Sequence, residues 1–396
     1  MYNKEMEKLG KQASAIRTLF EYGKAKKKEI GDEFVYDFSI GNPSVASPSI
    51  VNETLIKLIN EKEATLLHGY TSASGDDNVK KAIEEYLNKT YNANVCYKDI
   101  YMTCGAAASL AITFNALINK GEEVIVFAPF FPEYKVFVEK ASGNIDIVQS
   151  DKDFQIDFED LNKHINENTK IVVINSPNNP TGVIYTEENI KKLAKLLEEK
   201  SKLYKHPIYL VSDEPYRELI YSNVKYPFVT KYYKNSVVCY SFSKSLSLPG
   251  ERIGYILLSN EMEDKENVFN AVCGAGRSLG YVCAPALFQY MVPYCLGYTS
   301  DLSEYKKNLH DLKEMLEEIG YEVVKPEGAF YMFVASLEED ANKFSEVAKR
   351  FNLLLVPSDS FGVKSYVRIA YCVSNAQIKA SKEAFTNLYK FYKEEK

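Results

Sequence analysis

The sequence predicts an α/β protein in two parts: a large domain built on a mostly parallel sheet flanked by helices, and a small α+β domain. From about residue 100, short apolar runs alternate with stretches of helical periodicity. That alternation is typical of a parallel sheet that is buried on both faces. After about residue 300, one long charged helix is followed by shorter extended runs. This change of pattern indicates the second, smaller domain.

The composition excludes several classes of protein. Of the 396 residues, 46% are hydrophobic and 26% are charged, which predicts a large packed core rather than disorder. The net charge is −6, so the chain lacks the basic surface that nucleic-acid binding needs. No apolar run approaches the roughly 18 residues of a membrane helix. We therefore expect neither nucleic acid nor a membrane as a partner.

The cysteines and histidines bear on location and metal binding. Seven cysteines lie far apart with no C-x-x-C spacing, a pattern typical of reduced thiols. Residues 1–28 are charged throughout and lack the apolar stretch of a signal peptide. We therefore expect a cytoplasmic protein. The four histidines stand apart from one another, so no metal site is predicted.

The N-terminal segment is predicted to be a helix followed by extended chain. Ser14 is a suitable N-cap for a helix that runs to Lys28, and Gly31 follows its end. Phe34–Ile40 is expected to be extended, with a turn at residues 41–44. We expect this segment to pack with the small domain.

The remaining elements follow from periodicity and apolar character. Strands are expected at Ile100–Thr103, Val124–Phe127, Ile171–Ile174, Ile208–Val211 and Val237–Tyr240. Helices are expected at Ala106–Ile118 and after a Thr186 cap, the second with one buried face formed by Ile190, Leu193, Ala194 and Leu197. The C-terminal part is predicted to contain a helix Leu302–Ile319 ended by Gly320, extended runs at Tyr321–Val324, Ala329–Val334, Leu353–Val356 and Tyr366–Tyr371, and a final helix that runs to the C-terminus.

Small and polar residues follow the ends of the predicted strands. They are Gly105, Asn179, Asp213, Ser241, Ser243 and Lys244. Ligands of open parallel sheets bind beyond the carboxyl ends of the strands. We therefore expect these residues to converge on one crevice.

Two of these segments suit a phosphate group. Gly105–Ala108 lies between a strand and a helix, where small side chains let backbone N–H groups approach an anion. Close packing of the strand on the helix is an alternative explanation of the same residues. Ser241, Ser243 and Arg252 add two hydroxyls and a guanidinium, which matches phosphate oxygens.

Lys244 and Asp213 suit covalent and electrostatic chemistry. Near cations and shielded from water, Lys244 is predicted to have a lowered pKa and to act as a nucleophilic amine. An ordinary solvated surface lysine is the alternative. Asp213 suits pairing with a ring nitrogen that it keeps protonated, and a turn or helix-cap aspartate is the alternative.

Four motifs occur in order along the chain. They are Asn178-Asn179-Pro180-Thr181-Gly182, Ser212-Asp213-Glu214-Pro215-Tyr216, Ser243-Lys244 with Arg252-Ile253-Gly254-Tyr255, and Val367-Arg368-Ile369-Ala370. Together they resemble the class I/II aminotransferases of the aspartate aminotransferase fold, which are pyridoxal 5′-phosphate (PLP) enzymes. The resemblance implies the PLP-dependent transferase fold type I, with a mostly parallel seven-stranded sheet. It also implies a large domain at residues 45–295 and a small domain formed by residues 1–44 and 296–396.

The resemblance implies a role for each residue of the predicted site. Lys244 is implied to be the Schiff-base lysine and proton carrier, and Asp213 the partner of the pyridine nitrogen. Asn179 and Tyr216 are implied donors to the cofactor's 3′-oxygen, with Phe131 stacked on the ring. The implied phosphate cup is Gly105, Ala106, Ala107, Ser241, Ser243 and Arg252, joined by Tyr70 from the neighbouring subunit of a homodimer. The implied substrate contacts are Arg368, Gly41 and Asn179.

The implied activity is that of an aminotransferase (EC 2.6.1.-), which moves an amino group between an L-amino acid and a 2-oxo acid through a ping-pong cycle of PLP and pyridoxamine phosphate. The same residues would serve a PLP-dependent C–S β-lyase or a decarboxylase. A PLP-binding regulator is a third alternative, although the residues before Gly41 are too few for a DNA-binding module. Arg277 is only a candidate partner for a side-chain carboxylate, and Tyr331 is assigned to core packing.

Overall fold

A seven-stranded sheet forms the centre of the molecule in the computed structural model, which describes residues 2–11 and 14–394. The strand order is β2-β8-β7-β6-β5-β3-β4. The strands are β2 (Ile100–Thr103), β3 (Glu123–Ala128), β4 (Asn144–Gln149), β5 (Thr169–Asn175), β6 (Tyr209–Asp213), β7 (Ser236–Ser241) and β8 (Gly254–Leu258). Of these seven strands, β8 alone runs in the opposite direction to the other six. The predicted α/β fold with a mostly parallel sheet is confirmed.

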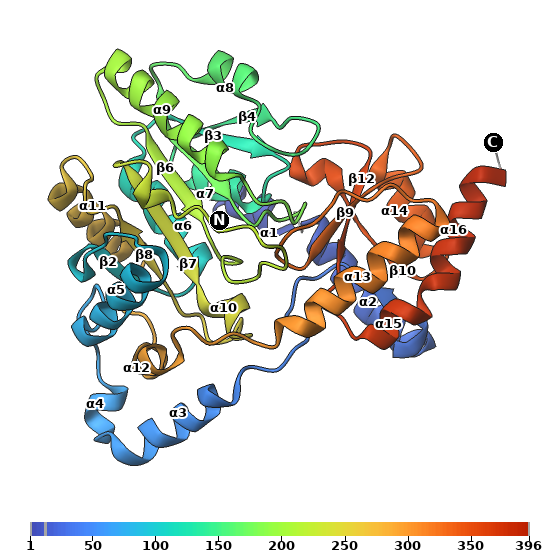
Figure 1. The fold of residues 1–396 in the computed structure, drawn as a ribbon, viewed down its shortest axis with the longest axis horizontal. Coiled ribbons are helices and arrows are strands. Elements are labelled where there is room, and N and C mark those ends of the chain that lie inside the picture. The colour runs from blue at the N-terminus through green and yellow to red at the C-terminus, as the bar shows by residue number, and fades with distance from the viewer. Residues whose placement is uncertain (1, 12–13, 395–396) are drawn as a thin grey trace.

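Helices cover both faces of this sheet (Figure 1). One face packs against α6 (Ala106–Leu117), α7 (Glu133–Lys140) and α11 (Lys265–Ser278). The other packs against α5 (Asp77–Tyr91), α8 (Phe158–His164), α9 (Glu187–Tyr204) and α12 (Ala286–Cys295). In β5, Val173 faces the first set and Val172 the second. Because both faces are covered, residues that face either side are apolar along the middle of such a strand, and this explains the continuous apolar runs in the sequence.

The C-terminal part, together with elements from the N-terminal segment, forms a smaller α+β unit at the right of Figure 1. It holds a three-stranded antiparallel sheet, β11-β12-β9, and a two-stranded parallel pair, β1-β10. The strands are β1 (Tyr36–Asp37), β9 (Tyr331–Ala335), β10 (Leu353–Leu354), β11 (Val356–Pro357) and β12 (Tyr366–Ala370). The helices are α2 (Ala15–Ile30), α13 (Leu302–Ile319), α14 (Ala341–Lys349), α15 (Asn375–Ala380) and α16 (Lys382–Glu394).

The N-terminal segment packs with this smaller unit, as the sequence predicts. Leu19 of α2 lies in one cluster with Phe333 and Val356, and β1 pairs with β10. The domain boundaries at residues 45 and 295 stay a prediction.

Helix ends agree closely with the sequence-based expectations. The Ser14 hydroxyl accepts a hydrogen bond from the Arg17 N–H at 3.3 Å and caps α2, which ends at Gly31. Thr186 caps α9 in the same way, with its hydroxyl 3.1 Å from the N–H of Asn189. The predicted bounds of α13 coincide with the observed ones. The final helix is described to residue 394, and its predicted last two residues lie outside the described ranges.

Two predicted extended segments are wrong in part. Tyr321–Val324 forms no strand, and its ladder contact is a single bridge between Val323 and Val334. In the segment Phe34–Ile40, Phe34 ends a 3-10 helix and only β1 is a strand. Both segments lie at the margin of a small sheet, where few neighbours are present to continue the pairing.

The remaining helices extend from the body or connect the strands. The pair α3 (Ser49–Glu61) and α4 (Ala64–His68) projects as an arm at the lower left of Figure 1. The others are α1 (Lys4–Lys11), α10 (Phe242–Ser245) and the 3-10 turns Asp32–Phe34, Tyr97–Asp99, Val229–Lys231 and Ser358–Phe361. Within the described ranges, we find no helix with the length and apolar character to cross a membrane.

The direction of β8 matters for the site. Its first residue, Gly254, is paired with Ser241 at the end of β7 and with Thr103 at the end of β2. An antiparallel strand therefore begins at the edge where the parallel strands end. Arg252, two residues before Gly254, is thereby brought to the carboxyl edge of the sheet.

Candidate active site

A cavity of about 170 Å³ lies at the carboxyl edge of the sheet. It is bounded by the ends of β5, β6 and β7 and by the start of α6. The lining residues are Ala106, Ala107, Leu110, Phe131, Asn175, Asn179, Asp213, Pro215, Tyr216, Ser241, Ser243, Lys244, Pro249 and Arg252. Residues that the sequence places at separate strand ends thus meet in one place.

Lys244 lies in α10, the single turn that follows β7. Its Nζ donates a hydrogen bond to the carbonyl O of Gly41 at 2.8 Å. Burial lowers the pKa of Lys244 to about 8, and the charges of Arg252 and Arg368 act in the same direction. Near neutral pH, a larger share of this amine is therefore unprotonated than in an exposed lysine, and the unprotonated form is the one that attacks a carbonyl carbon.

Asp213 ends β6 and is buried. Its Oδ2 accepts a hydrogen bond from the Tyr134 hydroxyl at 2.6 Å, whereas its Oδ1 has no partner within the described part of the chain. Burial raises the pKa of Asp213 to about 7; the Tyr134 hydrogen bond opposes this shift, and the charge of Glu214 adds to it. A buried carboxylate with one oxygen free is suited to a cationic ligand.

The start of α6 lies against Arg252. Gly105 precedes the helix with a φ of +87°, a conformation that favours glycine. A Cβ at Gly105 would lie 2.9 Å from Nη2 of Arg252, so the close approach of backbone and guanidinium needs a residue without a side chain. No described side chain caps the helix. The N–H groups of its first turn, beginning at Ala106 and Ala107, therefore stay free to bind an anion.

Two hydroxyls complete this side of the cavity. Ser241 Oγ lies 2.8 Å from Ser243 Oγ and accepts the Ser243 N–H at 3.2 Å. Arg252 Nη1 donates to the carbonyl O of Pro249 at 3.0 Å and lies 3.4 Å from Ser243 Oγ. Hydroxyls, a guanidinium and a helix N-terminus surround one point, and this donor set suits a phosphate.

Arg368 lies on β12 and joins the small unit to the large one. Its Nη1 donates to Asn179 Oδ1 at 3.0 Å, and its Nη2 donates to the carbonyl O of Ser39. The guanidinium stands 4.5 Å from the ring centre of Tyr331, and its Nε has no hydrogen-bond partner within the described ranges. Burial lowers the pKa of Arg368 from its ordinary value. Gly41 lies beside the same tyrosine, since a Cβ there would clash with the Tyr331 hydroxyl.

Aromatic side chains enclose the rest of the site. Tyr216 is buried and its hydroxyl lies 3.0 Å from that of Tyr331. Tyr331, which the sequence assigns to core packing, is buried among apolar side chains and also reaches the site through this contact. Phe131 lines the cavity and meets the ring of Tyr134 edge-on, with 5.7 Å between the ring centres.

Two residues considered from the sequence lie elsewhere. Tyr70 follows α4 on the arm, is 97% exposed and does not line the cavity of its own chain. Arg277 is exposed on α11 and does not line the cavity either. Within one chain, the structure therefore offers no contact for Tyr70 with the predicted cofactor residues.

Sequence reasoning missed Tyr134 and Asn175. Asn175 Nδ2 donates to the backbone O of Asp213 at 2.9 Å, and its Oδ1 accepts from the Asn179 N–H at 2.7 Å. Asn175 ends β5, so its position at a strand end could have placed it among the predicted site residues. Tyr134 lies on α7 and carries no such signal, because only the folded chain brings it to Asp213.

The chain matches the sequence family described as aminotransferase class I and II over residues 34–385. Because the match spans most of the chain, the protein belongs to this family, whose members generally depend on PLP. It is therefore an aminotransferase, a transferase of the group EC 2.6.1. The resemblance found from the motifs is confirmed. The β-lyase, decarboxylase and regulator alternatives are not favoured.

Individual relatives agree with this assignment. The aspartate aminotransferase of Bacillus subtilis is 30% identical over 390 residues, covering 93% of this chain and 95% of that protein. The solved structure of an aminotransferase from Eubacterium rectale is 54% identical, with a TM-score of 0.97 and 99% coverage of both chains. The aspartate aminotransferase structure from Thermotoga maritima is 25% identical, with a TM-score of 0.85, and covers 98% of this chain and 99% of that one.

Proposed function

We propose that this aminotransferase holds PLP in the strand-end cavity, with Lys244 as its covalent anchor. The observation that carries the proposal is Asp213, a buried carboxylate with one oxygen bound by Tyr134 and the other without a partner among the described residues. A carboxylate in this setting suits the protonated nitrogen of a pyridine ring. When bound, PLP supplies an aldehyde carbon and a ring that withdraws electrons.

The other cavity residues fit the same molecule. The start of α6, at Gly105, Ala106 and Ala107, would hold the phosphate together with the Ser241 and Ser243 hydroxyls and Arg252. Three further residues would hold the ring: Phe131 through one face, and Asn179 and Tyr216 through its oxygen substituent.

The residues around Arg368 would orient the substrate. Arg368 would bind the α-carboxylate of the amino acid, and its buried Nε, which has no partner among the described residues, is a donor for one of the carboxylate oxygens. The backbone of Gly41, which accepts a hydrogen bond from Lys244, lies beside the same position. Fixing the carboxylate directs one bond of the substrate Cα toward Lys244. The Lys244 amine would take the Cα proton and return it to the carbon that has received the amino group.

Reversal of these steps with a second 2-oxo acid completes the transfer between an L-amino acid and a 2-oxo acid. Lys244 then moves the proton in the opposite direction, and Arg368 holds the carboxylate of the incoming oxo acid. One set of side chains thus serves both halves of the reaction, as a ping-pong cycle requires.

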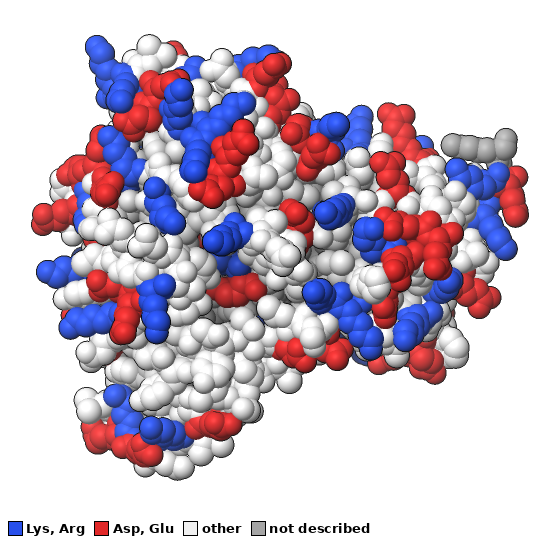
Figure 2. Space-filling model, in the orientation of Figure 1, with Lys and Arg blue, Asp and Glu red and all other residues white. Residues whose placement is uncertain are grey.

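We infer that two copies of the chain pair through the arm. Apolar side chains on α3, α4 and α12 are exposed to solvent, among them Ile56, Ile59, Leu66 and Tyr294. Figure 2 shows that the surface between the arm and the body carries few charged side chains. An apolar surface with few charged side chains is typical of a subunit interface. In such a pair, Tyr70, which is exposed in a single chain, would reach the strand-end cavity of the partner subunit.

A cytoplasmic location is part of the proposal. All seven cysteines are unpaired, which is typical of proteins in reducing compartments.

The experiment that tests the cofactor assignment replaces Lys244 with alanine. Wild-type protein incubated with PLP is expected to show the visible absorbance of lysine-bound PLP. Lys244→Ala is expected to lack this band and to lose more than about 10⁴-fold in turnover, because both covalent attachment and proton transfer are removed. Lys195→Ala, at an exposed position of α9, is the matched control and is expected to behave as wild type. A wild type that stays colourless after incubation with PLP contradicts the proposal.

A further inference from the structure

A second cavity of about 410 Å³ lies beside the first. It is formed between α2, the chain that follows β1, and the start of α7. Phe131 lines both cavities, so the two spaces share one wall. Four apolar side chains contribute to the second cavity: Ile16, Phe20, Ile40 and Phe131.

The backbone of residues 39–41 connects this second cavity to the reacting groups. The Ser39 carbonyl accepts a hydrogen bond from Arg368, and the Gly41 carbonyl accepts one from Lys244. Between them, Ile40 turns its side chain into the second cavity. An amino acid held by Arg368 with its Cα near Lys244 is therefore next to this cavity, and its side chain can extend past Ile40 and Phe131.

The charges around the cavity disfavour an acidic side chain. Arg17, Glu21 and Glu133 complete the charged part of the lining, so two carboxylates stand against one guanidinium. Arg17 and Glu21 are exposed and lie at the rim, where solvent screens them. The interior is left to the four apolar side chains, which gain most from an apolar ligand.

We propose that this second cavity is the side-chain pocket of the amino donor, and that the preferred donors carry large apolar or aromatic side chains. The proposal rests on the proposed function of the first cavity. It differs from the activity for which several relatives are named, since these are aspartate or probable aspartate aminotransferases. Phe20 and Ile40 are the residues expected to set this preference.

The test compares the half-reactions of the PLP-loaded protein with phenylalanine, leucine, alanine and aspartate. The loss of the PLP absorbance band measures the rate of each half-reaction. Phenylalanine and leucine are expected to react with a kcat/KM at least about 10-fold above those of alanine and aspartate, since removal of apolar groups from a matched pocket costs this much or more. Aspartate reacting faster than phenylalanine overturns the pocket proposal and leaves the proposed function intact. If none of the amino acids causes loss of the PLP band, the proposed function fails and the pocket proposal fails with it.

Two variants sharpen the result. Phe20→Ala is expected to lower the ratio of kcat/KM for phenylalanine to that for alanine about 10-fold. Phe34→Ala removes an exposed phenylalanine outside both cavities and is expected to leave this ratio unchanged. An unchanged ratio in Phe20→Ala overturns the pocket proposal. A selective loss of activity with aspartate in the Arg17→Gln variant also overturns the pocket proposal, because Arg17 would then bind an acidic side chain.

Discussion

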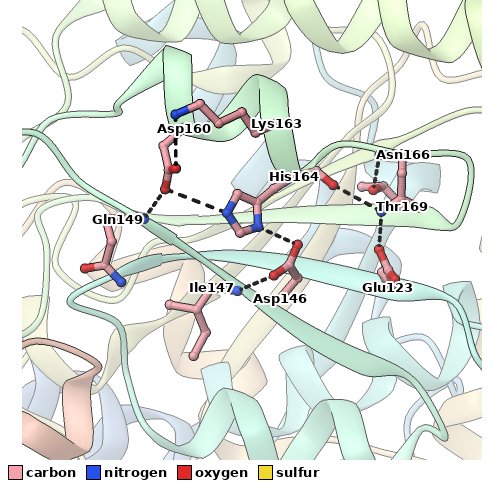
Figure 3. A network of polar contacts seen from close by, with 9 residues as sticks. All are labelled: Glu123, Asp146, Ile147, Gln149, Asp160, Lys163, His164, Asn166 and Thr169. Atoms are coloured by element: carbon pink, nitrogen blue, oxygen red, sulfur yellow. Dashed lines mark hydrogen bonds and ion pairs between the residues drawn. The ribbon is translucent and has the colours of Figure 1, made fainter.

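The polar groups at the outer edge of the sheet and those at its carboxyl edge are arranged in opposite ways. At the outer edge, His164 of α8 lies between two carboxylates (Figure 3). Its Nδ1 is 2.8 Å from Asp146 Oδ2 and its Nε2 is 3.8 Å from Asp160 Oδ2. The same carboxylates accept the backbone N–H groups of Ile147 and Gln149. At the carboxyl edge, by contrast, Asp213 is more deeply buried and keeps one oxygen without a partner in the described chain.

Under the proposed function, the outer-edge groups stabilise the fold, whereas the groups at the carboxyl edge stay available to a ligand. A satisfied polar cluster stabilises the protein on its own. A buried carboxylate with an unpaired oxygen lowers the stability of the free protein until a partner binds. We therefore expect substitutions in the cavity to remove activity without destabilising the cofactor-free protein. Substitutions at the outer edge should do the reverse.

Among the substitutions that test this comparison, the largest effect is expected for Asp213→Asn. Loss of the charge opposite the ring nitrogen should lower kcat/KM about 10²- to 10³-fold. The cofactor-free variant should nevertheless be more stable than wild type at pH 8. Because burial raises the pKa of Asp213 to about 7 in the folded protein, against about 3.9 in an unfolded chain, wild-type stability falls as pH rises through this window. The asparagine removes that loss.

Melting temperatures of the cofactor-free proteins at pH 4 and pH 8 check this prediction. The difference between variant and wild type should be near zero at pH 4 and positive at pH 8. Asp153→Asn, at an exposed site, serves as the control and should not show this pH dependence. A variant less stable than wild type at pH 8 would contradict the role assigned to the unpaired oxygen.

The next largest effect is expected for Arg368→Lys. An ammonium group cannot reproduce the fork of the guanidinium, so KM for the amino acid should rise about 10- to 100-fold. The absorbance of bound PLP should stay unchanged, since Arg368 does not line the strand-end cavity that is proposed to hold PLP. Steady-state kinetics and a visible spectrum measure both. Arg277→Lys should leave KM unaltered, and an unaltered KM in Arg368→Lys would remove it from the substrate site.

A smaller effect is expected for Tyr134→Phe. The change removes the donor that lies 2.6 Å from Asp213 Oδ2 and keeps the ring. Because this hydrogen bond favours the ionised carboxylate, its loss should raise the pKa of Asp213 further and weaken PLP binding about 10-fold. Titration of the cofactor-free protein with PLP gives the affinity. Tyr22→Phe on α2 is the control, and equal affinities for both variants would count against this role for Tyr134.

The smallest effect is expected for His164→Ala at the outer edge. Loss of its contacts with Asp146 and Asp160 should lower the free energy of unfolding by about 1 kcal/mol. The variant should keep the kcat and KM of wild type. Denaturant unfolding and steady-state assays test the two statements. His310→Ala, where the pairing with Glu314 is largely exposed, should have a smaller effect, and an activity loss in His164→Ala would break the contrast between the two regions.

The sequence predicts the parallel strands well because burial on both faces makes them continuously apolar. It does not predict β4 (Asn144–Gln149), an edge strand whose residues are mostly half-buried or exposed and which lacks that pattern. β8 (Gly254–Leu258) is also missing from the strands expected from periodicity. Its apolar run is present in the sequence, but its antiparallel direction depends on pairing with β2, which lies far away along the chain. A pairing between strands that lie far apart in the chain cannot be predicted from the local sequence of either strand.

The site shows the same limit. The sequence singles out Lys244 and Asp213 as site residues because each follows an apolar strand and stands in a motif, and the fold places both of them in the wall of one cavity. Tyr134 was missed because 79 positions separate it from Asp213 and its own helix gives no reason to single it out. The second cavity could not be foreseen for a similar reason. Only the packing of α2 on the small unit brings Phe20 near Phe131.

The connection between β7 and β8 carries both Lys244 and Arg252. Since β8 is antiparallel, the chain leaves the sheet and returns to it at the same edge, and the two cations are fixed relative to each other by one short loop. Under the proposed function, a ligand must present a carbonyl group and an anion at the matching separation. Pyridoxal without its phosphate satisfies only the first requirement and leaves Arg252 without a counter-ion. Under that proposal, the hairpin would select the phosphorylated vitamer over the free one, and any insertion between the two residues should relax that selectivity.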